Sequence, residues 1–119
     1  MRRVIMLLVI AFALAPSGAG AHAFLDHAAP AVGSTLRAAP TEVSIWFTQQ
    51  LEPAFSGAEV ADGTGKRVDT GSTRVDAADA TLLHVALPPL PPGTYRVHWH
   101  VLSVDTHRTE GNFNFTIAP

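Results

Sequence analysis

Two short segments near opposite ends of the sequence carry residue types that bind metal ions. His22 directly follows a small-x-small triplet at residues 19–21, and Asp105 and His107 are separated by a single residue. If the chain is cut after residue 21, His22 offers two nitrogen donors, its α-amine and its imidazole Nδ1, which can hold one ion in a single chelate ring. Imidazole and amine nitrogens suit Cu(II) better than other common divalent ions. Processing at this point would therefore create a copper ligand.

The first 21 residues have the pattern of a secretory signal. Arg2 and Arg3 form a basic tip, residues 4–14 are an apolar run, and the triplet at residues 19–21 is a typical cleavage site. The apolar run is shorter than the roughly 20 residues that a membrane-spanning helix needs. We therefore expect a signal peptide at residues 1–21 and one exported domain at residues 22–119, located in the periplasm if the cell has an outer membrane.

The Asp105-x-His107 pair can contribute two further ligands. In an extended segment, residues two apart point to the same side, so a carboxylate and a neutral imidazole can converge on one point. Together with His22 they supply an amine, two imidazoles and a carboxylate, a set that fits the tetragonal preference of Cu(II). The alternative is an Asx-type turn with His107 in solvent. Ser103 lies too close in sequence to form a nucleophile–base relay with the same residues.

The other four histidines have weaker signals. His98 and His100 share the outward face of one expected strand, which is typical either of a solvated sheet face or of an accessory metal site. His27 and His84 are isolated in the sequence, and we expect both at the surface. His27 is an odd number of residues from His22, so it would point the opposite way on an alternating strand.

Composition narrows the possible ligands and partners. The chain has no cysteine, and its two methionines lie in residues 1–21, so the expected domain contains no sulfur. A soft Cu(I) site is therefore excluded unless imidazoles alone form it. Without Arg2 and Arg3, 6 basic residues face 10 acidic ones, a net charge of −4. No basic cluster remains to bind nucleic acid or anionic lipid. No strong dimer patch is visible either, and we expect a monomer.

Short apolar-alternating runs separated by Gly, Pro, Asp and Ser predict an all-β sandwich or barrel of about seven strands. The Asp62-Gly63 pair predicts a hairpin between two of the runs. The clearest run places Tyr95, Val97, Trp99 and Val101 in the core. The expected strands span residues 22–27, 42–48, 55–61, 66–70, 81–87, 94–101 and 111–118.

With these residues in place, the sequence resembles the CopC family of periplasmic copper-resistance proteins over essentially the whole of residues 22–117. The resemblance rests on motifs that keep the same order along the chain: His22, Ala29-Pro30, Gly33-Ser34, the strand with Val43, Ile45 and Phe47, Leu51, Phe55-Ser56-Gly57, Leu90-x-x-Gly93-x-Tyr95-x-Val97-x-Trp99, and Val101-x-Ser103-x-Asp105-x-His107-x-x-x-Gly111-x-Phe113-x-Phe115.

The resemblance implies an immunoglobulin-like Greek-key fold and a Cu(II) site formed by the processed His22, Asp105 and His107. Some family members bind Cu(I) through a methionine-rich loop. The corresponding residues 59–68 contain no methionine, so the chain is similar to the Cu(II)-only branch. Some members also place a glutamate near the site, where this chain has Gln49, a poor ligand. The function implied is sequestration or delivery of copper, in the second case to an inner-membrane copper transporter or another periplasmic copper protein.

Two other functions fit parts of the pattern. An amino-terminal histidine with a second imidazole also forms the copper site of polysaccharide monooxygenases, but the expected domain has few outward aromatic residues, and a carboxylate near copper would suppress oxygen chemistry. Peroxide production by the copper-loaded protein would favour such an enzyme. A metal-free immunoglobulin-like interaction domain would show no tetragonal Cu(II) spectrum with one equivalent of copper. We expect a copper-binding protein without catalytic activity.

Overall fold

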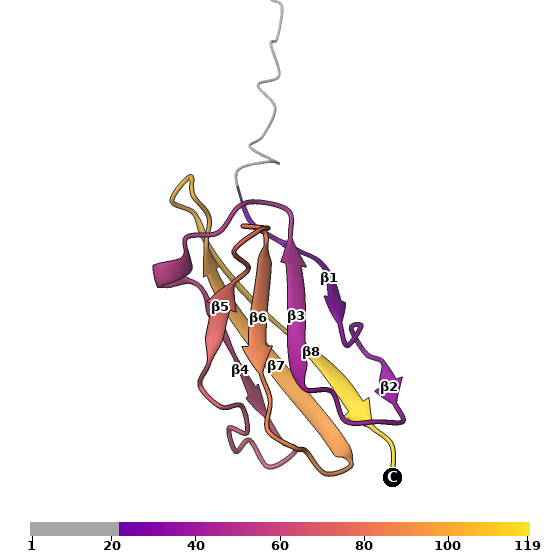
Figure 1. Ribbon diagram of the computed structural model, residues 1–119. Helices are drawn as coiled ribbons and strands as arrows, with labels where there is room; N and C mark the ends of the chain where they lie inside the picture. Colours follow the sequence, from indigo (N-terminus) through magenta and orange to yellow (C-terminus); the bar gives the residue numbers. More distant parts are fainter. Residues whose placement is uncertain (1–21) are drawn as a thin grey trace, which may run out of the picture.

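A computed structural model describes residues 22–119, and the predicted signal peptide lies outside the described residues. The described chain forms eight strands in two four-stranded sheets, which lie one behind the other in Figure 1. One sheet has the order β1-β3-β6-β5 and the other the order β2-β8-β7-β4. The predicted all-β sandwich is therefore confirmed, with eight strands instead of about seven.

All neighbouring strands are antiparallel except β2 and β8, which run parallel. The first sheet consists of β1 (Leu25–Ala29), β3 (Glu42–Phe47), β6 (Leu82–Ala86) and β5 (Thr73–Val75). The second consists of β2 (Thr35–Leu36), β8 (Arg108–Ile117), β7 (Gly93–Leu102) and β4 (Gly57–Ala61). A short 3-10 turn, η1 (Pro53–Phe55), precedes β4. Within the described part of the chain, no helix is long and apolar enough to cross a membrane.

The core lies between the sheets and follows the alternation of the sequence. Every second residue of β7 and of the last part of β8 is buried, and β3 contributes the facing layer. Phe115 is fully buried, and burying a side chain of this size stabilises the fold by roughly 1.5–3 kcal/mol. The core residues predicted for these three strands are confirmed: Val43, Ile45, Phe47, Tyr95, Val97, Trp99, Val101, Phe113, Phe115 and Ile117.

Gly111 is needed where the Trp99 ring crosses its partner strand. The two residues are paired between β7 and β8, and a Cβ atom at residue 111 would lie only 2.5 Å from Cζ2 of Trp99. The indole instead lies over the glycine and meets Phe47 edge-on, with ring centroids 5.1 Å apart. This contact joins β3 of one sheet to β7 of the other through the core.

Several strand boundaries differ from the prediction. The first strand begins at Leu25 and not at His22, and the last strand begins at Arg108, three residues earlier than predicted. The strand predicted at residues 55–61 begins only at Gly57, because Phe55 belongs to η1. Two strands were not predicted, β2 and β5, because two or three residues are too few to show alternation. The residues before Leu25 approach the rest of the molecule through the contacts described below.

The predicted strand at residues 66–70 is wrong, although the hairpin before it forms. Asp62 accepts backbone hydrogen bonds from Thr64 and Lys66 and closes the turn. Arg67 forms an isolated bridge with Ala61, and the N–H of Val68 donates to the carbonyl of Val60 at 2.8 Å. Beyond Val68, a side chain replaces the ladder. The carboxylate of Asp69 accepts a hydrogen bond from the backbone N–H of Val60 at 2.8 Å, so a strand partner for β4 does not continue there.

Candidate metal centre

One end of the sandwich brings together three segments that are far apart in the sequence: residues 22–24, residues 48–50 and the loop between β7 and β8 (Figure 1). Backbone hydrogen bonds connect them in series. The N–H of Thr48 donates to the carbonyl of Phe24 at 2.9 Å, and the N–H of Val104 donates to the carbonyl of Gln50 at 3.0 Å. The fold thus places His22 at the same end as Asp105 and His107.

The segment that carries His22 is fixed by two threonines. The hydroxyl of Thr48 accepts a hydrogen bond from the Phe24 N–H at 3.0 Å and donates one to the His22 carbonyl at 3.3 Å. Thr109, near the start of β8, donates its hydroxyl proton to the carbonyl of Ala23. Ala23 itself is fully buried. The backbone of residues 22–24 is therefore anchored to the residue that follows β3 on one side and to β8 on the other.

Ser103 organises the loop that holds the other two candidate ligands. It is fully buried, its hydroxyl donates to the carboxylate of Asp105, and the same oxygen accepts the backbone N–H of His107 at 3.3 Å. Thr106 adopts a left-handed conformation with φ of 74°, a conformation that is unfavourable for a threonine and that the surrounding contacts maintain. The two ligand candidates thus lie on a turn and not on the extended segment that the sequence predicted.

The side chains of His22 and His107 meet at this end. Their ring centroids are 4.4 Å apart, with the ring planes inclined by 54°. Nδ1 of His107 lies 3.4 Å from Oδ1 of Asp105. The hydrogen bond from Ser103 is the main reason why the pKa of Asp105 lies below its usual range, and the neighbouring His107 ring lowers it further. Asp105 is therefore ionised at neutral pH and available as an anionic ligand.

The three residues do not surround a common point as the chain stands. Within residues 22–119, no group of three or more Asp, Glu or His side chains is arranged to hold a metal ion. The structure brings His22 to His107 and His107 to Asp105, but the Asp105 carboxylate is turned toward Ser103. The nitrogen of His22 is also a peptide nitrogen in the full chain, and only cleavage after residue 21 turns it into an amine. The donor set fits Cu(II) once these two changes are made.

The expectation that His84 lies at the surface is wrong. Its residue exposure is only 9%, and both of its ring nitrogens have partners. Nε2 lies 2.9 Å from Oδ1 of Asp76, and Nδ1 lies 3.2 Å from the hydroxyl of Ser44 and 3.3 Å from Oε1 of Glu42. A buried polar ring needs such partners. His84 is therefore a structural residue on the outer side of the first sheet.

His27 is at the surface, as predicted, but it is not isolated. Its ring stacks on Trp46, with centroids 4.4 Å apart and planes inclined by 8°, and its Nδ1 lies 2.7 Å from the carboxylate of Asp26. This contact also covers part of the outward-facing indole of Trp46. Gln49 is half-buried in the loop that follows Thr48, and its contribution to the site stays a prediction.

Together, these features define a class of protein: a small β-sandwich with a paired histidine site at one end of its sheets. A family model described as the CopC domain matches residues 25–118. Copper resistance protein C of Xanthomonas campestris pv. juglandis is 33% identical over 115 residues, which cover 92% of this chain and 90% of the relative.

A second relative, copper transport protein CutJ of Bacillus subtilis, is 33% identical over 97% of this chain but only 21% of its own length. The crystal structure of CopC from Methylosinus trichosporium OB3b superimposes with a TM-score of 0.78 and 36% identity, covering 82% of this chain and 95% of that one. The chain belongs to the CopC family.

Proposed function

We propose that this protein binds Cu(II) in the periplasm through His22, Asp105 and His107 and sequesters or delivers it. The observation that carries the proposal is the contact between the His22 and His107 rings, which come from segments 85 positions apart and are held together by the anchors on residues 22–24 and 103–107. The relatives named for copper resistance and copper transport support copper as the cargo.

The chemistry of the residues supports Cu(II) over Cu(I). Residues 22–119 contain neither cysteine nor methionine, and Cu(I) prefers sulfur ligands. After cleavage, the amine and Nδ1 of His22, one ring nitrogen of His107 and the ionised Asp105 supply three nitrogens and one oxygen. The ion arrives as cargo, and the residues of the chain hold it and give it up.

The exposure of the site supports exchange of the ion with a partner. The side chains of His107 and Asp105 keep 47% and 40% of their surface exposed, so a second protein can reach the copper without unfolding this one. We infer delivery to an inner-membrane copper transporter or to another periplasmic copper protein, with this protein acting as a monomer. Delivery to a copper transporter is supported by the match of this chain to a part of the longer copper transport protein CutJ.

Three versions of the chain that differ only at the amino terminus test the proposal. They begin at Ala21, His22 and Ala23, and their Cu(II) affinities are measured by competition with a chelator of known affinity. The His22 version should bind one equivalent most tightly. The Ala21 version keeps the imidazole but displaces the amine, and the Ala23 version loses both donors.

We expect both altered versions to bind more than about 100-fold less tightly, since even outer-sphere partners of a metal site are worth 10–100-fold. Circular dichroism provides the control, because all three versions keep the same strands. Equal Cu(II) affinity of the three versions would contradict the proposal.

A further inference from the structure

A second group of histidines and carboxylates lies on the outer face of the second sheet, which has the order β2-β8-β7-β4. Glu59 is on β4, His98 and His100 are on β7, and Glu110 is on β8. Strand pairing places them side by side: Glu59 is directly opposite His98, and Glu110 is directly opposite His100. Residues on adjacent strands at such positions are within side-chain contact. The four side chains therefore form one cluster, called here the β7 cluster.

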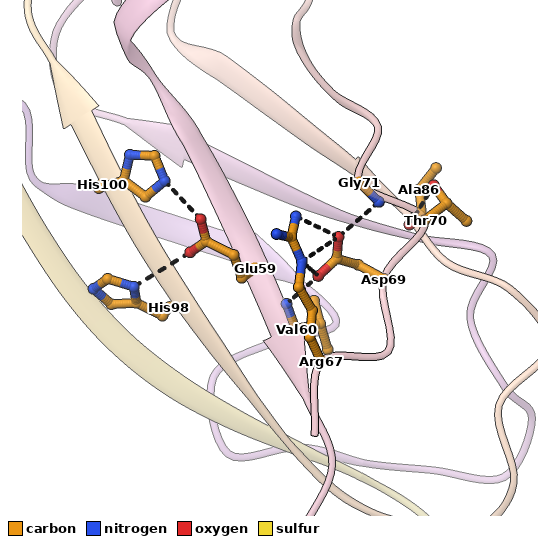
Figure 2. A network of polar contacts seen from close by, with 9 residues as sticks. All are labelled: Glu59, Val60, Arg67, Asp69, Thr70, Gly71, Ala86, His98 and His100. Carbon is orange, nitrogen blue, oxygen red and sulfur yellow. Dashed lines mark hydrogen bonds and ion pairs between the residues drawn. The ribbon is translucent and has the colours of Figure 1, made fainter. Parts of the chain in front are cut away.

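The carboxylate of Glu59 faces both imidazoles of the β7 cluster. Its Oε2 lies 3.3 Å from Nδ1 of His98, and its Oε1 lies 3.0 Å from Nε2 of His100 (Figure 2). The two imidazole rings are on the same side of the carboxylate, with centroids 6.0 Å apart. One carboxylate and one nitrogen from each of two histidines thus point toward a shared region.

These separations are those of ligands around a small divalent ion. Nitrogen and oxygen ligands lie about 2.0–2.2 Å from Zn(II), so neighbouring ligand atoms are about 2.8–3.1 Å apart in a square arrangement and about 3.3–3.6 Å apart in a tetrahedral one. Two imidazoles and one carboxylate are also a known ligand set for Zn(II), with the fourth position left for water. An ion can therefore take the place of the protons that now connect Glu59 to the two rings, once the three side chains have rotated to surround it.

Glu110 is placed to support such a site from outside. Its Oε2 lies 3.4 Å from Nε2 of His98, the ring nitrogen that does not face Glu59. A metal-bound imidazole commonly donates its other N–H to a carboxylate, which fixes the tautomer and the ring orientation. Glu110 would hold the proton of His98 on Nε2 and leave Nδ1 free to bind the ion.

The surroundings leave room and negative charge for an ion. Gly57 lies opposite His100, and a Cβ atom there would be only 3.2 Å from Cε1 of the ring. Arg67, the nearby cation in Figure 2, is engaged by both carboxylate oxygens of Asp69, at 3.1 and 2.9 Å. Arg67 is therefore paired with Asp69 and not with Glu59, so the negative charge of Glu59 can attract an ion.

We propose that Glu59, His98 and His100 bind a divalent ion of the Zn(II) type, with Glu110 orienting His98, at a site that does not depend on His22. The three side chains now form a hydrogen-bonded group and must rotate to surround an ion, in keeping with the lack of a ready-made metal group in residues 22–119. They are free to do so, because His98, His100 and Glu59 keep 41%, 46% and 36% of their side-chain surface exposed.

The test uses Zn(II) as the probe and a chain without the first site. This reference chain begins at Ala23 and carries His107→Ala, so its Zn(II) binding does not depend on the proposed copper function. Isothermal titration calorimetry should show one equivalent of Zn(II), and amide NMR shifts should concentrate on β4, β7 and β8. Either His98→Gln or His100→Gln should weaken binding at least about 10–100-fold, the usual cost of disturbing even the outer partners of a metal site.

Two further variants sharpen the result. Glu110→Gln should weaken Zn(II) binding about 10-fold, the lower end of the effect of an outer-sphere partner, without abolishing it. His27→Gln is the matched control. His27 is also an exposed histidine beside a carboxylate, that of Asp26, but both residues lie on the first sheet. This substitution should leave Zn(II) binding unchanged.

Absence of Zn(II) binding in the folded reference chain would overturn the proposal. So would binding that survives both His98→Gln and His100→Gln, or binding that His27→Gln weakens as much as they do. Loss of Cu(II) binding in the Ala23 version together with retained Zn(II) binding would separate the two sites.

Discussion

His84 and His107 lie in the same sandwich with opposite surroundings. Both ring nitrogens of His84 are occupied by Asp76 on one side and by Ser44 and Glu42 on the other, and its side chain is only 11% exposed. His107 is 47% exposed, and its ring contacts another histidine and a carboxylate at an open end of the fold. A histidine with satisfied nitrogens holds the protein together, whereas one with accessible nitrogens can bind an ion.

The comparison also applies to the backbone around the two rings. His84 is in the middle of β6, paired with Ser44 of β3, so its position depends on a regular ladder. His107 follows a turn that one buried hydroxyl, that of Ser103, keeps in place. We therefore expect substitutions around His84 to change the free energy of unfolding and substitutions around His107 to change Cu(II) affinity. Measuring both quantities for each variant tests this distinction.

The largest effect is expected for His107→Ala. Because this substitution removes a proposed ligand from an exposed position, Cu(II) affinity of the chain that begins at His22 should fall more than about 100-fold. The free energy of unfolding without metal should change by less than about 0.5 kcal/mol, as for most surface substitutions. Chelator competition measures the first quantity and urea unfolding the second.

His84→Ala should give the reverse result. It leaves Asp76, Ser44 and Glu42 without their shared partner and leaves a gap where the buried ring was. Together these losses should lower the free energy of unfolding by about 2–3 kcal/mol. Cu(II) affinity of the folded protein should stay within about twofold, because distant sites act independently. A large loss of copper affinity in this variant would mean that the two regions are coupled.

Ser103→Ala should have a smaller, mixed effect. The hydroxyl binds both Asp105 and the backbone of His107, so its loss should weaken Cu(II) binding by about 10-fold, the lower end of the range for outer-sphere partners. It should also lower the unfolding free energy by about 1 kcal/mol, the typical value of a hydrogen bond. Ser56→Ala is a suitable control, since the Ser56 hydroxyl accepts a hydrogen bond from the backbone N–H of Leu102, the last residue of β7, and not from the loop at residues 103–107.

The smallest expected effect is a change in how the free energy of unfolding depends on pH, caused by Asp76. The hydrogen bond from His84 is the first reason why the pKa of Asp76 lies below its ordinary value, followed by the backbone N–H of Ala78. A depressed folded pKa stabilises the protein above the unfolded value of about 3.9, and the contribution is lost as the pH falls through the folded value. Urea unfolding between pH 5 and pH 2 should therefore depend less on pH in Asp76→Asn than in the natural chain, and an unchanged slope would contradict this role.

The long strands could be predicted from the sequence because their alternation is unambiguous. β3, β7 and the last part of β8 carry apolar residues at every second position, and the sandwich buries those positions. β2 and β5 are too short to show a pattern, and the strand predicted at residues 66–70 fails because the Asp69 side chain takes the N–H of Val60 that a strand would have used.

The sequence could name His22, Asp105 and His107 as candidate ligands but could not give their arrangement. Their closeness depends on contacts between distant segments, such as Thr48 with Phe24 and Thr109 with Ala23, which no local pattern reveals. The burial of His84 escaped prediction for the same reason, because it requires the register that places Ser44 opposite it and the turn that brings Asp76 to its other side. The pairing of Glu59 with His98 likewise depends on the register of β4 and β7.

The most direct measurement is a crystal structure of the chain that begins at His22, loaded with one equivalent of Cu(II). We expect a single copper ion bound by the α-amine and Nδ1 of His22, a ring nitrogen of His107 and the carboxylate of Asp105, at the end of the sandwich opposite the hairpin at residues 62–66. A copper ion located elsewhere, with the amino terminus of His22 unbound, would contradict it.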